Sequence, residues 1–259
     1  MKINKKINRS LLAAVLILLS VNLTLQSQSL QYSMPVETSQ HEGTWLAWPH
    51  DSTYYSGYRE FFEPAWVEMT RELVKGENVH IIIYNQAEQD HVMQKLTDSG
   101  VSLAKVDFYI HPTDDYWIRD NGPIFVKDAS NVMAATDWDF DGWGNDAAFA
   151  LDNVVPALVA GDLNMNVINL NTVELEGGAV ASDGFGTFMG TESSILGDGR
   201  NPGLTTDDME EYMTTYLGFT HFIWLDGTYG GNFDITDSHI DGFATFLDTS
   251  TIVTMKQND

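Results

Sequence analysis

The sequence predicts an α/β fold, in which buried strands alternate with amphipathic helices along one domain. Residues 79–84 form a β-branched run, Val-His-Ile-Ile-Ile-Tyr, which is typical of a strand covered on both faces. Residues 58–74 carry apolar side chains at helical spacing, among them Phe61 and Met69, and Gly76 indicates the end of that helix. Comparable strand and helix pairs recur at intervals of about 50 to 60 residues. We therefore expect repeated β-α-β units within one domain.

The remaining elements are expected from the same signals. Strands are predicted at residues 43–49, 106–110, 124–127, 132–140, 166–170, 222–225 and 251–255, and a hairpin at residues 173–189. Further helices are predicted at residues 86–97, 146–160 and 206–217. In the first of these, Val92, Met93 and Leu96 are expected to face inward. No linker-like composition interrupts residues 32–259.

Composition and charge exclude some partners and favour others. The 259 residues include 13 Lys plus Arg against 37 Asp plus Glu, a formal net charge of −24. Such a surface repels phosphate backbones, so we do not expect nucleic-acid binding. It attracts cations, including amines, guanidinium compounds and divalent metals. The content of 7 Trp, 10 Tyr and 13 Phe indicates a packed core.

The first thirty residues predict a targeting segment. Lys2, Lys5, Lys6 and Arg9 precede an uncharged apolar run at residues 11–21, and small or polar residues follow at 27–29. This is the pattern of a secretory signal peptide, here assigned to residues 1–30. We expect an exported protein, periplasmic or extracellular, with no other membrane segment. An uncleaved membrane anchor is the alternative.

The chain contains no cysteine. An exported protein without disulfides depends on its core for stability. The same absence means that no thiol nucleophile is available within these residues.

One stretch near the end of the chain carries a possible acid–base pair. His239 and Asp241 precede an alternating polar and apolar run. In a strand, positions i and i+2 point to the same face, so the imidazole and the carboxylate would project together. That pairing suits proton transfer to or from a polar substrate. The alternative is a surface His and Asp at the end of an edge strand.

Residues 117–123, Trp-Ile-Arg-Asp-Asn-Gly-Pro, combine a large aromatic, two opposite charges and a turn. Trp117 offers a flat face to a cationic or planar group. Asp120 can accept two parallel hydrogen bonds from a guanidinium. The alternative is a local structural ion pair between Arg119 and Asp120.

Two further acidic stretches are weaker signals. Glu176 precedes Gly177 and Gly178, and paired glycines allow the backbone to approach another group closely, so the carboxylate can face a cavity. Its alternative is a solvated Glu at a hairpin bend. Residues 137–142 resemble the start of a calcium loop, but Ala148 stands where the bidentate Glu is needed, so no EF-hand is predicted. We predict no metal site at His239 and Asp241, because a third or fourth ligand is not evident.

Taken together, five ordered blocks resemble the agmatine deiminase and bacterial peptidylarginine deiminase family of the guanidino-group-modifying (pentein) superfamily. The blocks are residues 34–49, which include His-Glu-Gly-Thr-Trp-Leu-Ala-Trp-Pro, and then residues 115–123, 137–144, 175–178 and 236–242. The resemblance implies an α/β propeller of five ββαβ blades around a polar channel. It assigns residues 31–259 to one pentein deiminase domain, incomplete at its C-terminus and lacking the last blade.

The resemblance also implies a reaction and a set of roles. A guanidinium would be hydrolysed to a ureido group with release of ammonia, by a Cys-His-Asp covalent mechanism that needs no cofactor. Asp120 and Asp241 would bind the guanidinium nitrogens, and Trp117 would line the substrate slot. His239 would protonate the leaving ammonia and then activate water. Glu176 would be a further carboxylate of the site that orients the His.

The chain departs from the family pattern in two ways. The family's nucleophile is a cysteine in a glycine-rich C-terminal segment, and this chain has none. We expect a truncated product rather than an inactive family member, because the His, Asp and Glu positions are all present. Ser238 stands where the family usually has glycine, and a small residue there should be tolerated.

The substrate is expected to be agmatine, converted to N-carbamoylputrescine, because residues 140–145 contain no basic residue to capture a carboxylate. Export instead favours the alternative of a peptidylarginine deiminase acting on protein arginine. A hypothesis of another class is an inactive exported module that binds guanidines or amines. The sequence leaves the oligomeric state open.

Overall fold

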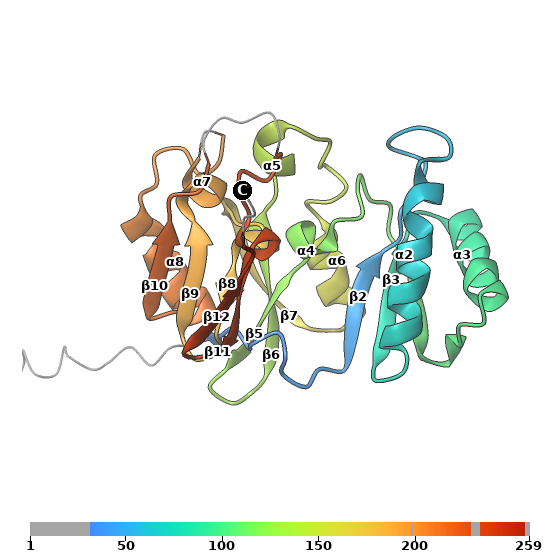
Figure 1. Ribbon diagram of the computed structural model, residues 1–259, viewed down its shortest axis with the longest axis horizontal. Coiled ribbons are helices and arrows are strands. Elements are labelled where there is room, and N and C mark those ends of the chain that lie inside the picture. Colours follow the sequence, from blue (N-terminus) through green and yellow to red (C-terminus); the bar gives the residue numbers. More distant parts are fainter. Residues whose placement is uncertain (1–31, 198, 229–233, 257–259) are drawn as a thin grey trace, which may run out of the picture.

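The computed structural model describes residues 32–197, 199–228 and 234–256. The expected signal peptide at residues 1–30 lies outside the described residues. Within the described part, we find no helix whose length and apolar character would let it span a bilayer. The described residues form a mixed α/β fold, as predicted (Figure 1).

The first sheet is parallel, with strand order β2-β3-β4. Its strands are β2 (Gly43–Ala47), β3 (Asn78–Ile83) and β4 (Val106–Ile110), connected through the helices α2 (Tyr58–Leu73) and α3 (Gln86–Asp98). Figure 1 shows α2 and α3 beside this sheet at the right of the molecule.

The central strand of this sheet is covered on both faces, which confirms the prediction from its β-branched run. Val79, Ile81 and Ile83 belong to one apolar cluster, whereas Ile82 belongs to another, and all four are at most 1% exposed. The alternation follows from the period of two in a strand. β3 therefore joins two cores.

Two later segments share the order strand, strand, helix, strand. In the first, β5 (Ile124–Asp128) pairs antiparallel with β6 (Met133–Asp139), and α6 (Val155–Asp162) leads to β7 (Asn166–Glu174), which pairs parallel with β6. The short β1 (Tyr32–Ser33) adds an antiparallel edge beside β5.

The second such segment repeats this topology. β8 (Ala181–Ser182) pairs antiparallel with β9 (Thr187–Thr191), and β10 (His221–Leu225) pairs parallel with β9. Two helices, α7 (Glu192–Leu196) and α8 (Thr206–Leu217), lie between β9 and β10. The repetition agrees with the expected β-α-β units.

A hairpin and five short helices complete the described elements. β11 (Ala244–Asp248) and β12 (Thr251–Thr254) pair antiparallel. The short helices are η1 (Leu103–Lys105), α4 (Ile118–Asn121), α5 (Gly142–Asn145), η2 (Gly177–Ala179) and η3 (Ile240–Gly242). Four of them, α4, α5, η2 and η3, carry or flank the site described below.

The helix predicted at 146–160 is wrong over its first half, since the structure begins it only at Val155. The preceding residues bind other loops instead. The Asp152 carboxylate accepts hydrogen bonds from the backbone N–H groups of Asp114 and Asp115, and the Asn153 side chain accepts one from Phe140. Side chains that satisfy distant backbone groups compete with local helix formation.

The inward direction predicted for one helix residue is also wrong. Val92 and Leu96 are fully buried, whereas Met93 is 37% exposed. Phe61, one of the apolar residues that predicted α2, is 75% exposed. Each helix buries a narrower stripe than its apolar content suggests, because the sheet contacts only one side of it.

Candidate active site

His239 lies in a loop rather than in a strand, so the prediction that His239 and Asp241 project from one face of a strand is wrong. His239 precedes the 3₁₀ turn η3, and β11 begins only at Ala244. The residues before it, Asp237 and Ser238, adopt left-handed φ values of 53° and 72°. This conformation ends an extended run and favours glycine, the residue that the family resemblance implies at position 238.

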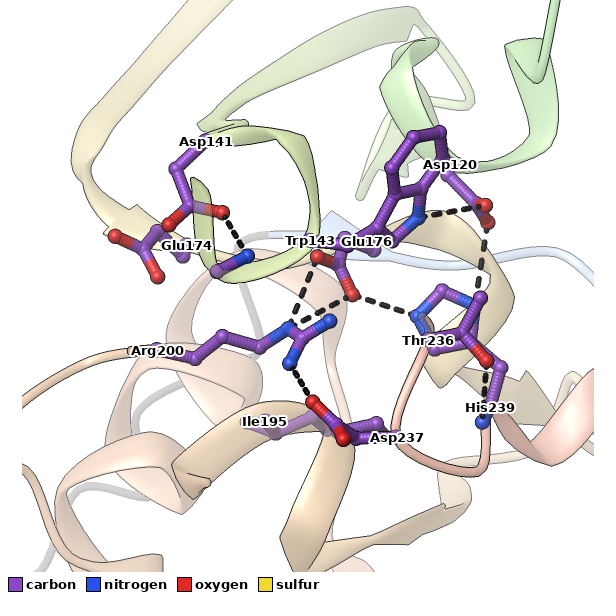
Figure 2. Close-up of polar contacts among 12 residues, drawn as sticks. Asp120, Asp141, Trp143, Glu174, Glu176, Ile195, Arg200, Thr236, Asp237 and His239 are labelled. Atoms are coloured by element: carbon purple, nitrogen blue, oxygen red, sulfur yellow. Dashed lines mark hydrogen bonds and ion pairs between the residues drawn. The ribbon is translucent and has the colours of Figure 1, made fainter. Parts of the chain in front are cut away.

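The loop before His239 is stabilised by its own side chains. The Asp234 carboxylate accepts hydrogen bonds from the backbone N–H groups of Thr236 and Ser238. The Thr236 hydroxyl accepts one from the backbone N–H of His239 at 3.3 Å (Figure 2). These contacts turn the chain so that the imidazole lies 4% exposed in the interior.

Asp120 is presented by the short helix α4 and is 8% exposed. Its Oδ1 accepts a hydrogen bond from the backbone N–H of Gly178 at 3.1 Å, and its Oδ2 accepts one from Trp143 Nε1 at 3.2 Å. Arg119 instead pairs with Glu37, at 2.6 Å. The alternative of a local Arg119–Asp120 ion pair is therefore wrong.

Glu176 is buried, at 3% exposed, so the alternative of a solvated bend is wrong. The two glycines that follow it allow close approach. A methyl group on Gly177 would lie 2.0 Å from the Arg119 carbonyl oxygen, and one on Gly178 would lie 2.5 Å from both Asp120 Oδ1 and His239 Nδ1. No side chain fits at either position, because contacts under 3.0 Å are not tolerated.

These residues surround the imidazole of His239 (Figure 2). Its Nε2 lies 2.6 Å from Glu176 Oε2, and its Nδ1 lies 3.4 Å from Asp120 Oδ1. Burial alone would lower the pKa of His239, but the hydrogen bonds and charges of Asp120 and Glu176 outweigh it and raise the pKa to about 10. The imidazole is therefore cationic at neutral pH and can donate a proton.

Asp241 lies on the same cavity. A methyl group placed on Gly178 would lie 3.0 Å from Asp241 Oδ2, which puts that oxygen close to Asp120 and His239. Burial and the charge of Asp120 raise the pKa of Asp241. Two carboxylates near one another favour a cation between them.

The cavity has a volume of about 740 Å³ and is partly open to solvent. Its lining includes Asp120, His239 and Asp241, together with Trp117, Tyr54 and Asp115. Trp117 is 46% exposed and packs against Tyr116 at 4.9 Å between ring centroids. A half-exposed indole at the cavity can contact a planar cation.

Sequence reasoning missed three contributors to this site. Trp143 donates to Asp120, Tyr54 donates to Asp115 at the cavity wall, and Arg200 donates to Glu176 from the interior. Trp143 lies within a block that carried the family resemblance, so a role for it could have been found there. Arg200 had no local signal except that it is one of 13 basic residues.

Across residues 32–197, 199–228 and 234–256, the structure shows no group of three or more His, Cys, Asp or Glu side chains able to bind a metal ion. His239 contacts Glu176 and Asp120, and Asp241 lines the cavity.

Comparison with known proteins places these features in a family. The model of the Porphyromonas-type peptidyl-arginine deiminase family matches residues 33–259. A Streptomyces coelicolor protein with the provisional name agmatine deiminase is 33% identical over 234 residues, which cover 88% of this chain and 67% of that protein. A Selenomonas ruminantium protein with the same provisional name is 30% identical, over 83% of this chain and 58% of that protein.

A solved structure agrees with the fold. The C. jejuni agmatine deiminase, solved as a cysteine-to-serine variant with substrate bound, has a TM-score of 0.78 and 26% identity, over 89% of this chain and 66% of that one. The chain thus spans between 58% and 67% of the length of these relatives. Because the family model covers nearly all of the described residues, this chain belongs to the Porphyromonas-type peptidyl-arginine deiminase family.

Proposed function

We propose that this chain supplies the guanidinium-binding and acid–base groups of a deiminase, which hydrolyses a guanidinium to a ureido group and releases ammonia. The observation that carries the proposal is the convergence of Asp120, His239 and Asp241 on one cavity, with Glu176 against the imidazole. Family membership supports the same reaction class.

Asp120 and Asp241 would bind the guanidinium. Asp120 is buried and Asp241 is exposed at the cavity, and their oxygens approach a common point beside Gly178. A planar cation with several N–H donors satisfies two such acceptors at once and becomes oriented by them. An arriving cation also lowers the pKa of Asp241, which burial and Asp120 have raised.

His239 would exchange the protons of the reaction. As a cation, it begins as the acid that protonates the leaving ammonia, and the neutral imidazole then accepts a proton from the attacking water. Glu176 would hold the imidazole by its Nε2, at 2.6 Å. The thiol nucleophile that the family resemblance implies is not among these 259 residues, since the sequence has no cysteine.

We include the five-bladed propeller in this proposal. Two segments with the order strand, strand, helix, strand support it, together with the β11–β12 strand pair that would open a further unit. Solution scattering of a chain as long as the full-length relatives tests it, because a closed ring of blades is expected to give a compact, disc-like profile. An elongated profile would contradict a closed ring of blades.

Agmatine is the substrate that the cavity favours. The lining of the cavity includes the carboxylates of Asp115, Asp120, Asp234 and Asp241, which suit a molecule with a cation at each end. One observation favours peptidylarginine as the second candidate. Arg119 also lines the cavity, and its ion pair with Glu37 is about half exposed, so it can exchange that partner for a substrate carboxylate or carbonyl.

Calorimetry with agmatine tests the binding part of the proposal. The C. jejuni cysteine-to-serine variant was solved with substrate bound, which supports measuring binding without the thiol. We expect heat of binding for the parent and a loss of it in the double variant Asp120→Asn, Asp241→Asn. The control, Asp90→Asn with Asp207→Asn, removes the same charge from exposed helix positions and should bind like the parent.

The two substrates are separated by titrating an acetyl-arginine amide under the same conditions. Tighter binding of the amide than of agmatine, lost in Arg119→Met, would favour the peptidylarginine candidate. Equal heats for the parent and the double Asp variant would remove the site altogether. An ammonia assay on this chain with agmatine should stay at background, because no thiol is present; ammonia release would contradict the covalent mechanism.

The apolar run at residues 11–21 supports the further proposal that the chain is exported. N-terminal sequencing of the protein recovered from the producing cell tests it. A start near residue 31 agrees with a cleaved signal peptide, and a chain that begins at Met1 contradicts cleavage.

A further inference from the structure

Arg200 is a buried charged residue that has no role in the proposed reaction. Its side chain is 1% exposed and is among the largest of the fully buried side chains in the described part. A buried guanidinium is costly unless its donors are all paired. Its partners therefore indicate what it does.

The guanidinium of Arg200 bridges two segments of the chain (Figure 2). Its Nε donates to both carboxylate oxygens of Glu176, at 3.0 and 3.3 Å. Its Nη1 donates to the Asp237 carboxylate, and its Nη2 donates to the Ile235 carbonyl oxygen at 3.2 Å. The planar fork of an arginine can satisfy such divergent acceptors at once, and a lysine ammonium cannot.

Both segments lead directly to His239. Glu176 contacts its Nε2, and residues 235–238 form the loop that delivers it. That loop contains two left-handed residues, Asp237 and Ser238, and no regular backbone ladder. Its position relative to Glu176 therefore depends on side-chain contacts. Arg200 makes two of them, to Asp237 and Ile235, and the hydroxyls of Thr191 and Ser193 donate to the carbonyl oxygens of Ser238 and Asp237.

Arg200 is itself fixed from the neighbouring residue. Asn201 Nδ2 donates to the carbonyl oxygens of Glu174 and Ile195, at 2.8 and 2.9 Å, and its Oδ1 accepts from the backbone N–H of Glu174 at 2.9 Å. These bonds attach the backbone beside Arg200 to the end of β7, just before Glu176. The guanidinium thus extends from a rigid base.

We propose that Arg200 is the positioning residue of the site: it fixes Glu176 and the 235–238 loop relative to each other, and through both it fixes the imidazole of His239. The inference rests on the proposed function only for the acid–base role of His239; the contacts of Arg200 do not depend on that function. It assigns to Arg200 an effect on the proton affinity of His239 without contact between the two.

A positioning role and a purely electrostatic role of Arg200 predict opposite changes in proton binding at His239 when Arg200 is removed. If Glu176 stays in place, removal of a nearby cation makes His239 bind its proton more tightly. If Arg200 is needed to hold Glu176 against the imidazole, its removal releases the carboxylate and His239 binds its proton more weakly. The titration of His239 therefore distinguishes the two.

The experiment is an NMR titration of the histidine side chains in the 259-residue chain, with the His239 signal assigned from a His239→Gln variant. We expect the parent signal to remain that of a cation through pH 8. In Arg200→Met, we expect at least tenfold weaker proton binding, one pKa unit. Arg200→Lys keeps the charge and should weaken proton binding as well. The control, Arg71→Met, removes a distant cation and should leave the titration unchanged.

Proton binding at His239 that is as tight as in the parent or tighter in Arg200→Met overturns the proposal. Proton binding in Arg200→Lys equal to that of the parent also overturns it. Because Arg200→Met can impair folding, a second pair acts on the partly exposed Asp237. Asp237→Gly accepts the φ of 53° but removes the acceptor, and it should weaken proton binding at His239. Asp237→Asn keeps an acceptor and should have the smaller effect; equal effects would contradict the proposal.

These results are separable from those for the function. If Arg200→Met leaves His239 unchanged while the Asp120, Asp241 variant still loses agmatine, the positioning role fails and the function stands. If the parent binds no agmatine but Arg200→Met shifts the titration, the positioning role stands and the function fails.

Discussion

Gly178 lies where three side chains of the site converge, and the substitution Gly178→Ala tests its geometry directly. A methyl group there would lie 2.5 Å from Asp120 Oδ1, 2.5 Å from His239 Nδ1 and 3.0 Å from Asp241 Oδ2. The first two side chains are 8% and 4% exposed and are held by hydrogen bonds, so they cannot recede into solvent.

The expected magnitude follows from two opposing effects. Replacing Gly by Ala stabilises a compatible site by about 0.4–1 kcal/mol, because the unfolded chain loses freedom. Overpacking a filled interior costs about 1–3 kcal/mol. Since all three contacts are too short, overpacking should dominate, and we expect a net loss of about 1–2 kcal/mol in the free energy of unfolding. Agmatine affinity should fall at least tenfold, about 1.4 kcal/mol, because the methyl group lies where the carboxylates converge.

Gly161→Ala is the matched control. Gly161 lies in α6, has no atom within 4 Å of the added methyl group, and is not recorded with a positive φ. Alanine in a helix is favoured over glycine by about 0.5–1 kcal/mol, so this variant should be more stable than the parent. Urea unfolding measures both variants, and calorimetry measures their binding of agmatine. If Gly178→Ala unfolds at or above the parent midpoint and binds agmatine equally well, the geometry of the site is wrong.

Three further predictions concern separate parts of the molecule. Burial and neighbouring carboxylates raise the pKa of Glu174 to about 7, so the free energy of unfolding falls as pH rises from the unfolded pKa of this carboxyl through 7. By urea unfolding, Glu174→Gln should raise the free energy of unfolding by about 1–2 kcal/mol at pH 8, after discounting for solvent screening, and should leave it unchanged at pH 4. An equal gain at both pH values would contradict it. Trp117→Ala should weaken agmatine binding several-fold, by calorimetry, with only a small loss of stability, since its half-exposed indole lines the cavity and packs against Tyr116; a stability loss above about 2 kcal/mol would refute this assignment. Glu63, fully buried, accepts from Trp48, His91 and Lys95, so Glu63→Leu should lower the free energy of unfolding by about 1–3 kcal/mol, in thermal or urea unfolding. An unchanged free energy of unfolding would contradict the prediction, because it would show that His91 and Lys95 are solvated in the variant without loss of stability.

The fold was predicted from sequence wherever periodicity decides it. β4 at Val106–Ile110 and α8 at Thr206–Leu217 have the predicted bounds, because continuous apolar patterns and a capping residue mark them. Prediction failed at 146–154 and at His239, where side chains bind backbone groups of the same or distant loops. Such contacts override local propensity and leave no periodic signal.

The site was predictable only in part. The motifs indicated Asp120, Glu176, His239 and Asp241, yet the contact between His239 and Glu176 joins residues 63 positions apart, which no local pattern reveals. The roles assigned to these residues stay predictions. Arg200 could not be found, since a buried arginine and an exposed one look alike in sequence and only tertiary contacts distinguish them.

The balance of charge explains why these groups favour a cation as ligand. The positive charge of Arg200 is already neutralised by Glu176 and Asp237, and that of Arg119 by Glu37. The cationic imidazole of His239 lies between Glu176 and Asp120. Asp241 faces the cavity, and within the described residues no ion pair of its own is recorded, so its charge is destabilised by burial and by Asp120. On the proposed function, a guanidinium that enters the cavity would relieve this cost, and the unfavourable desolvation of the Asp241 carboxylate would be converted into affinity and orientation of the substrate.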